Sequence, residues 1–483
     1  MSPRLSVLTA RDLPPEADPE IAGVTADSRK VKPGFLFAAL PGVHADGRDF
    51  VPAALAGGAA AILAEGPVAA ATPVIEVGDA RRAYALAAAA FWGKQPATCV
   101  AVTGTNGKTS VATFCRQIFE RLGHSSASMG TLGVRAGADQ LTAPGLTTPD
   151  AGDVARLLAD LAARGVTHLA LEASSHGIDQ RRLDGVTVTA SGFLNLTQDH
   201  LDYHLTMEAY RAAKLRLFEA LTPRGRTAVL NADSDAYPVF AASAVINGLS
   251  IFSVGAMGEG LTLANRTLVP EGQRLRIGAE GRNFDVLLPL AGAFQASNAL
   301  VAAGLCIAAG EDAEAVLAAL EHIEGAPGRM QRIGAGRKGG EAYVDYAHTP
   351  DGLKTVLLAL RPHAKGRLIV VFGAGGDRDR GKRPQMGAIA ASLADIAIVT
   401  DDNPRSEPPA AIRAEIRAGA SGLREIGDRR EAIAAAAALL RDGDVLVVAG
   451  KGHEQGQTIG AIIHPFDDVA ETAAALGLEP AHG

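Results

Sequence analysis

Short apolar runs rich in β-branched residues alternate along this chain with alanine- and leucine-rich segments whose apolar positions recur at helical spacing. That alternation is typical of βαβ units, in which helices connect the parallel strands of one sheet. The first set of expected strands covers residues 99–103, 166–171, 186–196 and 227–230, and the second covers 367–372, 396–400 and 445–449. The pattern therefore predicts an α/β fold.

Two interruptions of this alternation of strands and helices divide the chain. The first is Trp92-Gly-Lys-Gln-Pro96, just before the strand at 99–103, and the second is Gly325-Ala-Pro-Gly328. Cuts at these points predict three domains, at residues 1–94, 95–326 and 327–483. The chain length of 483 residues is enough for that number, because domains hold roughly 100 to 200 residues each.

The charge balance excludes several classes of protein. Lys and Arg number 46 against 53 Asp and Glu, which gives a net charge of −7, and no long basic run occurs. Proteins that coat nucleic acid or a membrane surface carry a basic excess, so we expect no nucleic-acid partner. The most apolar stretch, residues 83–92, is ten residues long, and a membrane-spanning helix needs about twenty. We therefore expect no membrane insertion.

The amino-terminal segment and the cysteines indicate the compartment. The first twenty residues are acidic and interrupted by prolines, without the basic and apolar regions of a secretory signal. Cys99, Cys115 and Cys306 lack the paired spacing of a zinc site or a redox pair. We therefore expect reduced thiols and a cytoplasmic location.

The strongest single motif is VAVTGTNGKTS at residues 100–110, a strand that runs into a glycine-rich turn and then into a helix ending near Gly123. Such a loop directs backbone N–H groups and a helix N-terminus at phosphate, while Lys108 adds a positive charge and the Thr109 hydroxyl can bind Mg²⁺. The usual GxxxxGK pattern would place glycine at Val102, so this turn is tighter. An ordinary glycine turn with a surface lysine is the alternative. The residues expected to contact ATP here are Gly104, Thr105, Asn106, Gly107, Lys108, Thr109 and Ser110.

The GTNGKT loop resembles the phosphate loop of the Mur ligase and folylpolyglutamate synthetase superfamily, whose members use ATP to join amino acids to carboxylates. The segment at residues 27–48 resembles the UDP-sugar domain of the Mur ligases of peptidoglycan precursor synthesis, a domain that folate ligases lack. The resemblance implies a central P-loop-type ATPase sheet and a C-terminal Rossmann-like sheet. It also implies that Ser28 and His44 bind the UDP substrate. A generic small α/β lid is the alternative for this segment.

A second motif, LALEASSHGI at residues 169–178, ends an apolar strand with a carboxylate, two hydroxyls and an imidazole. Ligands of open α/β sheets bind at the carboxyl ends of the strands. By the resemblance, Glu172 helps to hold magnesium, and the UDP-peptide substrate is bound by Thr147, Thr148, Ser174, Gln180 and Arg182. Taken singly, such residues are more often helix caps.

The segment NLTQDHLDYH at residues 195–204 supplies His200, which the resemblance makes a magnesium ligand. His200 and His204 are four residues apart, as on a metal-binding face of a helix, so zinc is an alternative. The general-base carboxylate of the HExxH pattern is missing, which disfavours it.

Lys214 is informative because of its periodicity. In the helix predicted over residues 206–221, Lys214 shares a stripe with Tyr210, Leu217 and Phe218, so it lies on the apolar face. Burial lowers the pKa of an ammonium group and leaves a neutral amine that can react with carbon dioxide. The resemblance implies that Lys214 is carbamylated and orders magnesium. A lysine that extends its charged end to solvent is the alternative.

Further residues are implicated by the resemblance on the ATP side. Asn298, in the segment GAFQASNAL, matches a family contact to adenine, and Arg329 matches an ATP-facing domain junction. Asp345 and His348, in DYAHTPD, are expected to contact ATP from the third domain.

Three loops of the third domain each follow an expected strand, at residues 373–379, 401–405 and 450–454. Parallel strands place such loops at one edge, where two guanidinium groups and a carboxylate would form a pocket for a zwitterion. Surface salt bridges that only stabilise the loops are the alternative. The residues expected to bind diaminopimelate there, by the resemblance, are Arg378, Asp402, Asn403, Pro404, Arg405, Gly450 and Glu454.

Together, the resemblance of these motifs to the family implies a Mur ligase that adds meso-diaminopimelate to UDP-N-acetylmuramoyl-L-alanyl-D-glutamate through an acyl phosphate, with ATP as co-substrate and Mg²⁺ as cofactor. Domain 1–94 would bind the UDP substrate, 95–326 ATP and 327–483 the amino acid, in a monomer. The catalytic residues would be Lys108, Lys214 and His200, and Thr109 would join Glu172, His200 and Lys214 at the metal. Alternatives are a lysine-adding or D-alanyl-D-alanine-adding Mur ligase, folylpolyglutamate synthetase, and a nucleotide-binding regulator without ligase chemistry.

Overall fold

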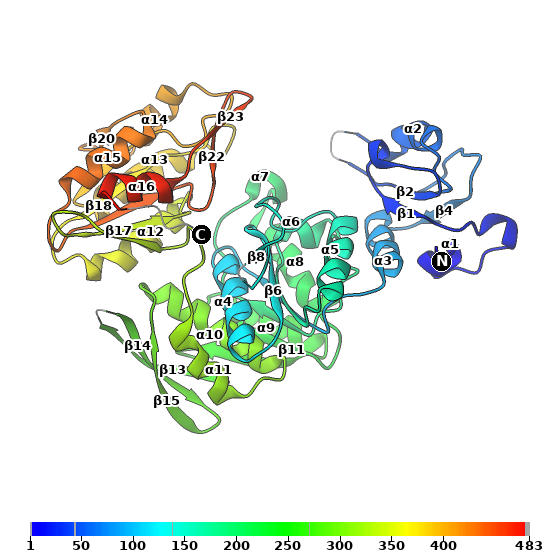
Figure 1. Ribbon diagram of the computed structural model, residues 1–483, viewed down its shortest axis with the longest axis horizontal. Coiled ribbons are helices and arrows are strands. Elements are labelled where there is room, and N and C mark those ends of the chain that lie inside the picture. Colours follow the sequence, from blue (N-terminus) through cyan, green and yellow to red (C-terminus); the bar gives the residue numbers. More distant parts are fainter. Residues whose placement is uncertain (1, 43–44, 138, 270, 479–483) are drawn as a thin grey trace.

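The computed structural model describes residues 2–42, 45–137, 139–269 and 271–478, and it confirms the α/β fold. Its strands form one sheet of four strands, one of eleven, one of six, and a two-stranded hairpin. The three larger sheets succeed one another along the chain and lie in three separate lobes, as the colours of Figure 1 show.

The N-terminal lobe is a small parallel sheet in the order β1-β2-β3-β4. Its strands are β1 (Gly23–Thr25), β2 (Phe35–Ala39), β3 (Ala61–Glu65) and β4 (Val74–Val77), and its helices are α1 (Leu5–Thr9), α2 (Val51–Ala56) and α3 (Ala80–Trp92). Helix α3 also packs on the central-lobe helix α5 (Ala151–Ala163), next to which the Tyr84 hydroxyl donates to Asp150 Oδ1 over 2.9 Å. This helix therefore connects the first sheet to the second.

The central lobe contains the eleven-stranded sheet, in the order β15-β14-β13-β12-β11-β10-β5-β9-β6-β7-β8. The strands are β5 (Thr98–Thr103), β6 (Ser126–Gly130), β7 (Gly133–Ala136), β8 (Asp139–Gln140), β9 (His168–Glu172), β10 (Ala190–Phe193), β11 (Thr227–Asn231), β12 (Ser250–Gly255), β13 (Leu261–Val269), β14 (Gly272–Ala279) and β15 (Arg282–Leu288). The helices are α4 (Lys108–Arg121), α5 (Ala151–Ala163), α6 (Ser175–Asp179), α7 (Leu201–His204), α8 (Met207–Arg216), α9 (Tyr237–Ile246), α10 (Ala293–Ala308) and α11 (Ala313–Ala319).

The site is positioned by the middle of this sheet. Strand β5 pairs in parallel with β10 on one side and with β9 on the other, so the carboxyl ends of all three lie at one edge. The apolar residues of β5 are fully buried, and α4 packs against α10 over one face of the sheet. Within the described residues, every helix is too short or too polar to cross a lipid bilayer.

The C-terminal lobe has a six-stranded sheet in the order β16-β17-β21-β18-β19-β20, parallel except for β16. Its strands are β16 (Gln331–Ala335), β17 (Glu341–Asp345), β18 (Leu368–Phe372), β19 (Ile396–Val399), β20 (Arg424–Glu425) and β21 (Val445–Ala449), with a separate hairpin of β22 (Gly456–Ile459) and β23 (Ile462–Pro465). The helices are α12 (Pro350–Leu360), α13 (Lys382–Leu393), α14 (Pro409–Arg417), α15 (Arg429–Leu439) and α16 (Asp468–Leu476).

Two expected elements differ from what the sequence pattern predicts. The strand expected at 186–196 is restricted to β10, because its partner β5 ends at Thr103 and the chain after Phe193 turns to pair with the phosphate loop. The helix expected at 206–221 is α-helical only to Arg216 and continues as a π-helical turn over Leu217–Leu221. The wider turn still buries Leu217, Phe218 and Leu221, so the apolar stripe is kept.

Candidate active site

The phosphate loop lies between β5 and α4. Gly107 has φ +91°, and a Cβ atom there would lie 2.4 Å from Asn298 Oδ1, so only glycine fits. The loop is held by the chain that follows β10, because Asn195 Oδ1 accepts from the Asn106 N–H over 2.9 Å and the Thr105 hydroxyl donates to the Thr197 carbonyl. This backbone has the form of an anion cradle at the start of a helix.

Two lysines converge on this loop. The Lys108 ammonium donates to the carbonyl oxygens of Gly104 and Thr105, over 2.8 and 3.0 Å. Lys214, which is 1% exposed, donates to Gly104 over 2.8 Å and lies 4.4 Å above the Tyr210 ring. Burial lowers the pKa of both amines, that of Lys214 far below its ordinary value, and the charge of Lys108 lowers the pKa of Lys214 further. The burial of Lys214 on its apolar stripe therefore disfavours the charged form of the amine.

An oxygen-rich group lies beside the loop. Glu172, at the end of β9, is 2% exposed and accepts from the Thr109 hydroxyl over 3.0 Å and from the Thr131 N–H over 2.8 Å. A Cβ at Gly130 would lie 2.0 Å from Glu172 Oε1, so this glycine makes room for the carboxylate. Carboxylate and hydroxyl oxygens next to a phosphate cradle are the donors that Mg²⁺ prefers, and this donor set fits that ion.

His200 stands in a cluster of aromatic side chains at the same edge. Its ring centroid is 4.9 Å from that of His176 and 6.0 Å from that of Tyr210. Burial lowers the pKa of His200 to about 4, against the opposing charge of Asp199, so its imidazole is neutral at physiological pH. A neutral imidazole can bind a cation. His204 is also in the cluster, and its ring is 5.4 Å from His176.

The residues expected to bind the UDP substrate form one hydrogen-bonded network in the central lobe. Thr148 Oγ1 lies 2.9 Å from Ser174 Oγ, Arg182 donates to the Thr148 carbonyl over 2.7 Å, and Arg182 also donates to Gln180 Oε1 over 2.6 Å. Thr147 Oγ1 lies 2.9 Å from Thr131 Oγ1, which links this network to Glu172. Ser28 lies elsewhere, in a 3₁₀ turn of the N-terminal lobe, and His44 lies outside the described residues.

Arg329 lies at the junction between the central and C-terminal lobes. Its guanidinium is 3.4 Å from Thr109 Oγ1 and lies 4.3 Å from the centroid of the Tyr346 ring. The Tyr346 and His453 rings are tilted against each other, with their centroids 5.0 Å apart. The buried Arg329 Nε and His453 Nδ1 have no hydrogen-bond partner among the described residues. These two buried polar atoms are therefore available to hydrogen-bond a ligand that lies against Arg329, Tyr346 and His453.

Asp345, His348 and Asn298 have protein partners in this arrangement. Both carboxylate oxygens of Asp345 accept backbone N–H groups, of Met330 over 2.6 Å and of Ala347 over 2.7 Å, and burial raises its pKa. His348 Nδ1 lies 2.8 Å from the Tyr346 carbonyl. Asn298 packs under Gly107 of the phosphate loop, and its side-chain amide donates to Gln295 Oε1 over 3.2 Å. These three residues therefore support the walls of the site.

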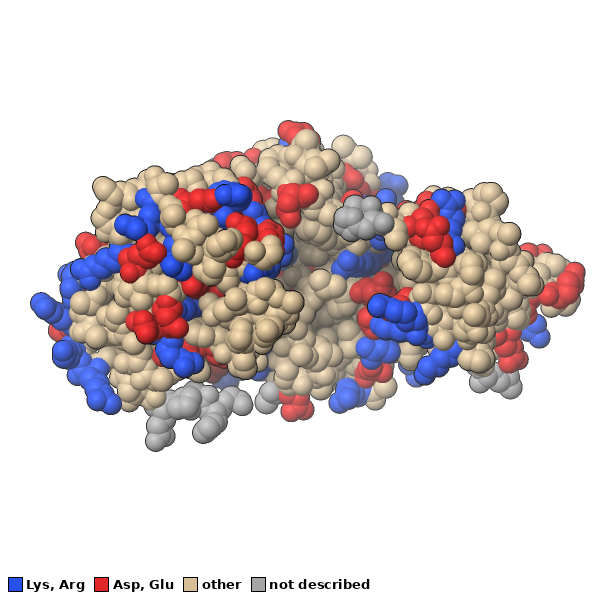
Figure 2. Space-filling model, turned by 90° about the horizontal axis from the view of Figure 1, so that it is seen from above, with Lys and Arg blue, Asp and Glu red and all other residues tan. Residues whose placement is uncertain are grey.

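A second contact joins the two lobes directly. Asp351 Oδ2, at the start of α12, accepts from Asn106 Nδ2 over 3.3 Å and from Thr197 Oγ1 over 3.2 Å. The C-terminal lobe therefore touches the phosphate loop and the loop after β10. Seen from above, the surface is hollowed between the lobes, and basic side chains lie in and beside the hollow (Figure 2).

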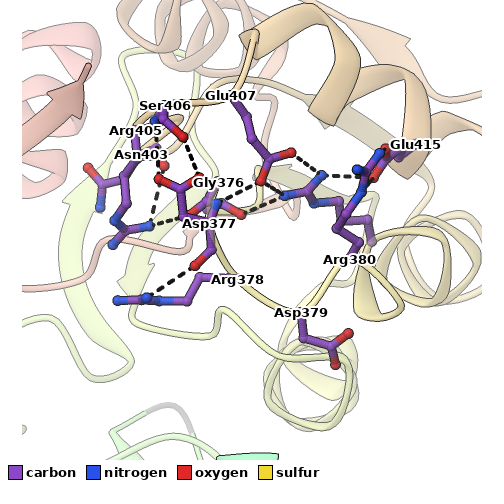
Figure 3. Close-up of polar contacts among 12 residues, drawn as sticks. Gly376, Asp377, Arg378, Asp379, Arg380, Asn403, Arg405, Ser406, Glu407 and Glu415 are labelled. Carbon is purple, nitrogen blue, oxygen red and sulfur yellow. Dashed lines mark hydrogen bonds and ion pairs between the residues drawn. The ribbon is translucent and has the colours of Figure 1, made fainter. Parts of the chain in front are cut away.

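The expected amino-acid pocket is built from the loops after β18, β19 and β21. A Cβ at Gly375 would lie 2.9 Å from the Arg405 guanidinium and 3.7 Å from Arg378 Cγ, so the side chains of both arginines lie next to this glycine. Figure 3 shows their guanidinium groups on the same side of the loops, where Arg405 donates to the Gly376 carbonyl over 2.9 Å. Arg378 donates to the Asp377 carbonyl over 3.2 Å.

The carboxylate of this pocket is held through Asn403. Glu454 Oε2 accepts from Asn403 Nδ2 over 2.8 Å, and the buried Lys451 ammonium donates to Asn403 Oδ1, also over 2.8 Å. Gly450 has φ +123°, and a Cβ there would lie 2.5 Å from the Asp402 carboxylate. Arg405 itself has φ +50°, and its backbone N–H donates to the Thr458 carbonyl of β22 over 3.0 Å.

Pro404 and a buried arginine fix the shape of these loops. A Cβ at Gly376 would lie 1.9 Å from the Pro404 carbonyl oxygen, so the two loops are in close contact. Arg383 is fully buried and donates to Glu407 over 2.7 Å and to Glu415 over 2.8 Å. The two carboxylates, of Glu407 and Glu415, balance the charge of the buried Arg383 guanidinium, and these ion pairs order the segment after Arg405.

Sequence reasoning missed several residues of the site. Lys382 donates to the His348 carbonyl over 3.0 Å, and its pKa is lowered by burial against the attraction of Asp199 and Asp402. Lys451 and Tyr346 were also missed. Lys451 adjoins a glycine-rich motif and Tyr346 stands inside DYAH, but nothing in a linear pattern shows that a lysine will be 0% exposed or that an aromatic ring will lie under Arg329.

Three family models match the chain in succession. The model described as "Mur ligase family, catalytic domain" matches residues 20–92, "Mur ligase middle domain" matches 102–306, and "Mur ligase, glutamate ligase domain" matches 328–452. Together they reach all three lobes.

Individual relatives agree with the models. The UDP-N-acetylmuramoyl-L-alanyl-D-glutamate–2,6-diaminopimelate ligase of Caulobacter vibrioides is 70% identical over 483 residues, which are 99% of each chain. A solved structure of a ligase with the same name is 35% identical with a TM-score of 0.73, covering 99% of both chains. The MurF ligase of Thermotoga maritima in complex with ADP shares the fold at 19% identity, with a TM-score of 0.63, covering 94% of this chain and 96% of that one.

Proposed function

The chain belongs to the Mur ligase family, and we propose that it uses ATP to join 2,6-diaminopimelate to UDP-N-acetylmuramoyl-L-alanyl-D-glutamate in peptidoglycan precursor synthesis. The observation that carries this function is the 70% identity, across all three lobes, to a ligase named for that reaction. The amino-acid loops fit it, because two arginines and a carboxylate on one edge suit a substrate with amino and carboxylate groups at both ends.

In the first step, the D-glutamate carboxylate attacks the γ-phosphorus of ATP. An O–P bond forms, the bond to ADP breaks, and an acyl phosphate results. Lys108 contributes positive charge where the negative charge of the β- and γ-phosphates develops. The ADP complex of the MurF neighbour supports nucleotide binding in this fold.

Magnesium is part of this proposal, held by Thr109, Glu172 and His200; when bound, it would neutralise phosphate charge. These side chains are suited to the task because Glu172 is buried next to the phosphate loop and the His200 imidazole stays neutral down to about pH 4. Glu172 also orients Thr109 through the hydrogen bond between them.

Lys214 is proposed to carry a carbamate. A neutral amine attacks carbon dioxide, a C–N bond forms and one proton is lost, which converts the neutral amine into an anionic carbamate. The buried amine of Lys214 supports this step, since its pKa is far below that of a free lysine. The carbamate would then attract Lys108 and cations at the phosphate loop.

In the second step, an amine of diaminopimelate attacks the acyl carbon. The tetrahedral species then expels phosphate, the amine loses a proton and an amide remains. We propose the meso isomer as substrate, with the second amino-carboxylate centre held by Arg405, Arg378 and Glu454. Asn403 fixes Glu454 for this role through a 2.8 Å hydrogen bond.

Acyl phosphate must be kept from water between the two steps. The contact of Asp351 with Asn106 and Thr197 brings the amino-acid lobe onto the phosphate loop, which supports closure of the two lobes during turnover. We assign residues 1–94 to the UDP substrate, 95–326 to ATP and 327–483 to the amino acid.

We further propose that the enzyme is a cytoplasmic monomer. Cys99, Cys115 and Cys306 are free and buried, which suits a reducing compartment. Size-exclusion chromatography with light scattering tests the monomer.

The function is tested by phosphate release from ATP with a panel of acceptors and amino acids. We expect release and product only with UDP-N-acetylmuramoyl-L-alanyl-D-glutamate and diaminopimelate together. Release with lysine, with D-alanyl-D-alanine or with a folate and glutamate would identify one of the related ligases instead. A nucleotide-binding regulator would show no release that depends on an amino acid.

A further inference from the structure

A cluster of two histidines and a glutamate lies at the opposite end of the central sheet from the phosphate loop. His124 Nε2 is 2.9 Å from Glu311 Oε1, and His168 Nε2 is 3.6 Å from the same oxygen. Among the residues that the structure describes, these form the one group of three His, Cys, Asp or Glu side chains whose ligand atoms all lie within 4.8 Å of one another. None of them belongs to the ligase site.

His168 has a polar neighbour at each ring nitrogen. Thr167 Oγ1 lies 2.9 Å from His168 Nδ1, and the Thr167 hydroxyl also lies 3.1 Å from the Ser125 carbonyl, which can accept its proton. The neutral tautomer that donates from Nδ1 to Thr167 leaves the lone pair of Nε2 facing the Glu311 carboxylate, 3.6 Å away. In that tautomer both atoms are acceptors, and a cation between them would satisfy both.

The separations suit a transition-metal ion. In a tetrahedral zinc site, with metal–nitrogen and metal–oxygen bonds of about 2.0–2.2 Å, neighbouring ligand atoms are roughly 3.3–3.5 Å apart. The two distances to Glu311 Oε1, 2.9 and 3.6 Å, lie on either side of this value. In that tautomer, the hydrogen bond from His168 Nδ1 to Thr167 is an outer-shell contact of the kind that orients imidazole ligands of metals.

The backbones of His124 and Glu311 are fixed by hydrogen bonds to the helices that they follow. The N–H of His124 donates to the Phe119 carbonyl over 2.9 Å, and the N–H of Glu311 donates to the Cys306 carbonyl over 3.2 Å. The side chain of His168 is 12% exposed and that of Glu311 17%, whereas that of His124 is 32% exposed and leaves a path to solvent.

We propose that His124, His168 and Glu311 bind one divalent transition-metal ion, with Zn²⁺ as the best match, and that this ion ties together three elements of the ATP site. His124 follows α4, which begins at Lys108. His168 begins β9, which ends at Glu172, and Glu311 follows α10, which contains Asn298. The ion would join the ends of these elements that are remote from the nucleotide.

Metal binding to the full-length protein tests this site. Chelator-treated protein is titrated with Zn²⁺ by calorimetry in excess Mg²⁺, and with Co²⁺ as a spectroscopic probe of four-coordinate geometry. We expect one equivalent to bind and the Tm to rise by about 5 °C at saturating Zn²⁺. His168→Gln and Glu311→Gln should each weaken binding about a hundredfold and abolish the rise in Tm, and His124→Gln, the most exposed of the three, serves if either fails to fold.

The matched control is His322→Gln, an exposed histidine outside the cluster, which should bind Zn²⁺ like the wild type. Unchanged Zn²⁺ affinity in His168→Gln or Glu311→Gln would overturn the proposal, as would loss of the tight site in His200→Gln alone, which would locate the ion at the ligase site. Absence of Zn²⁺ and Co²⁺ binding to the wild-type protein would likewise overturn it. Ligase assays assess the proposed function separately, so the two can fail independently.

Discussion

Lys108 and Lys214 donate hydrogen bonds to the same acceptor, the carbonyl oxygen of Gly104, each over 2.8 Å. Two ammonium groups on one oxygen repel each other, and the charge of Lys108 is indeed one cause of the lowered pKa of Lys214. The phosphate loop therefore pairs a lysine suited to phosphate with a buried lysine whose charged form is disfavoured. The first two predictions separate their roles.

Lys108→Ala should lower kcat for ligation by about a hundredfold or more, because it removes charge directed at the phosphates. The fold should remain intact, since the Lys108 ammonium contacts only loop carbonyls. Steady-state kinetics with saturating ATP and Mg²⁺, together with the Tm, measure both effects. Lys338→Ala, at an exposed lysine, is the control. Wild-type turnover in Lys108→Ala would contradict the assignment of the loop.

Lys214→Ala should be nearly inactive and partly rescued by acetate, because a small carboxylate can replace the anion of a carbamate. Lys214→Met fills the same apolar space without an amine and should fold but stay inactive. Activity is measured with and without added acetate and bicarbonate. Full activity of Lys214→Met would show that no carbamate is needed.

Arg405→Ala should reduce kcat/KM for diaminopimelate by about thirtyfold to several thousandfold, since losing one partner of a desolvated carboxylate pair costs roughly 2–5 kcal/mol. The wild type should reject lysine on a similar scale, because lysine leaves Arg405 without a carboxylate. The KM for ATP should hardly change. Equal use of lysine and diaminopimelate by the wild type would refute the pocket.

Asp351→Ala should lower kcat/KM by about thirtyfold, because it removes two hydrogen bonds, each worth about 1 kcal/mol, between α12 and the loops of the central lobe. The Tm should be almost unchanged, since Asp351 lies at a lobe junction rather than in a core. Lys354→Ala, an exposed residue on the same helix, should behave like the wild type. A variant with normal kinetics would show that this contact plays no part in closure.

His453 should make the protein sensitive to acid. Burial lowers the pKa of His453 from the ordinary 6.5 to about 4. Below pH 6.5, His453 therefore binds a proton in the unfolded chain but stays neutral in the folded protein. Stability is thus lost as the pH falls from 6.5 towards 4, and the loss amounts to about 2 kcal/mol at pH 5. Tm values measured near pH 7.5 and pH 5 should differ less in His453→Gln than in the wild type. An equal drop in both proteins would count against the buried neutral imidazole.

Patterns within single elements were enough to predict much of this protein. The glycines of the phosphate loop and the apolar stripe of Lys214 are local signals, and the structure has the turn at φ +91° and the lysine at 1% exposure. The edge on which Arg378 and Arg405 lie was also predictable, because carboxyl ends of parallel strands meet at one side of a sheet. The α/β fold followed from the same alternation of strands and helices.

Other relationships depend on the tertiary structure alone. The shared acceptor of Lys108 and Lys214 joins residues far apart in sequence, and Asp351 reaches Asn106 across a lobe boundary. His124, His168 and Glu311 come from three segments without a common motif. Helical and strand periodicity reports which face of an element is buried, because backbone geometry repeats along it. It does not report which elements become neighbours, because that depends on the order of the strands and on the packing of the whole chain.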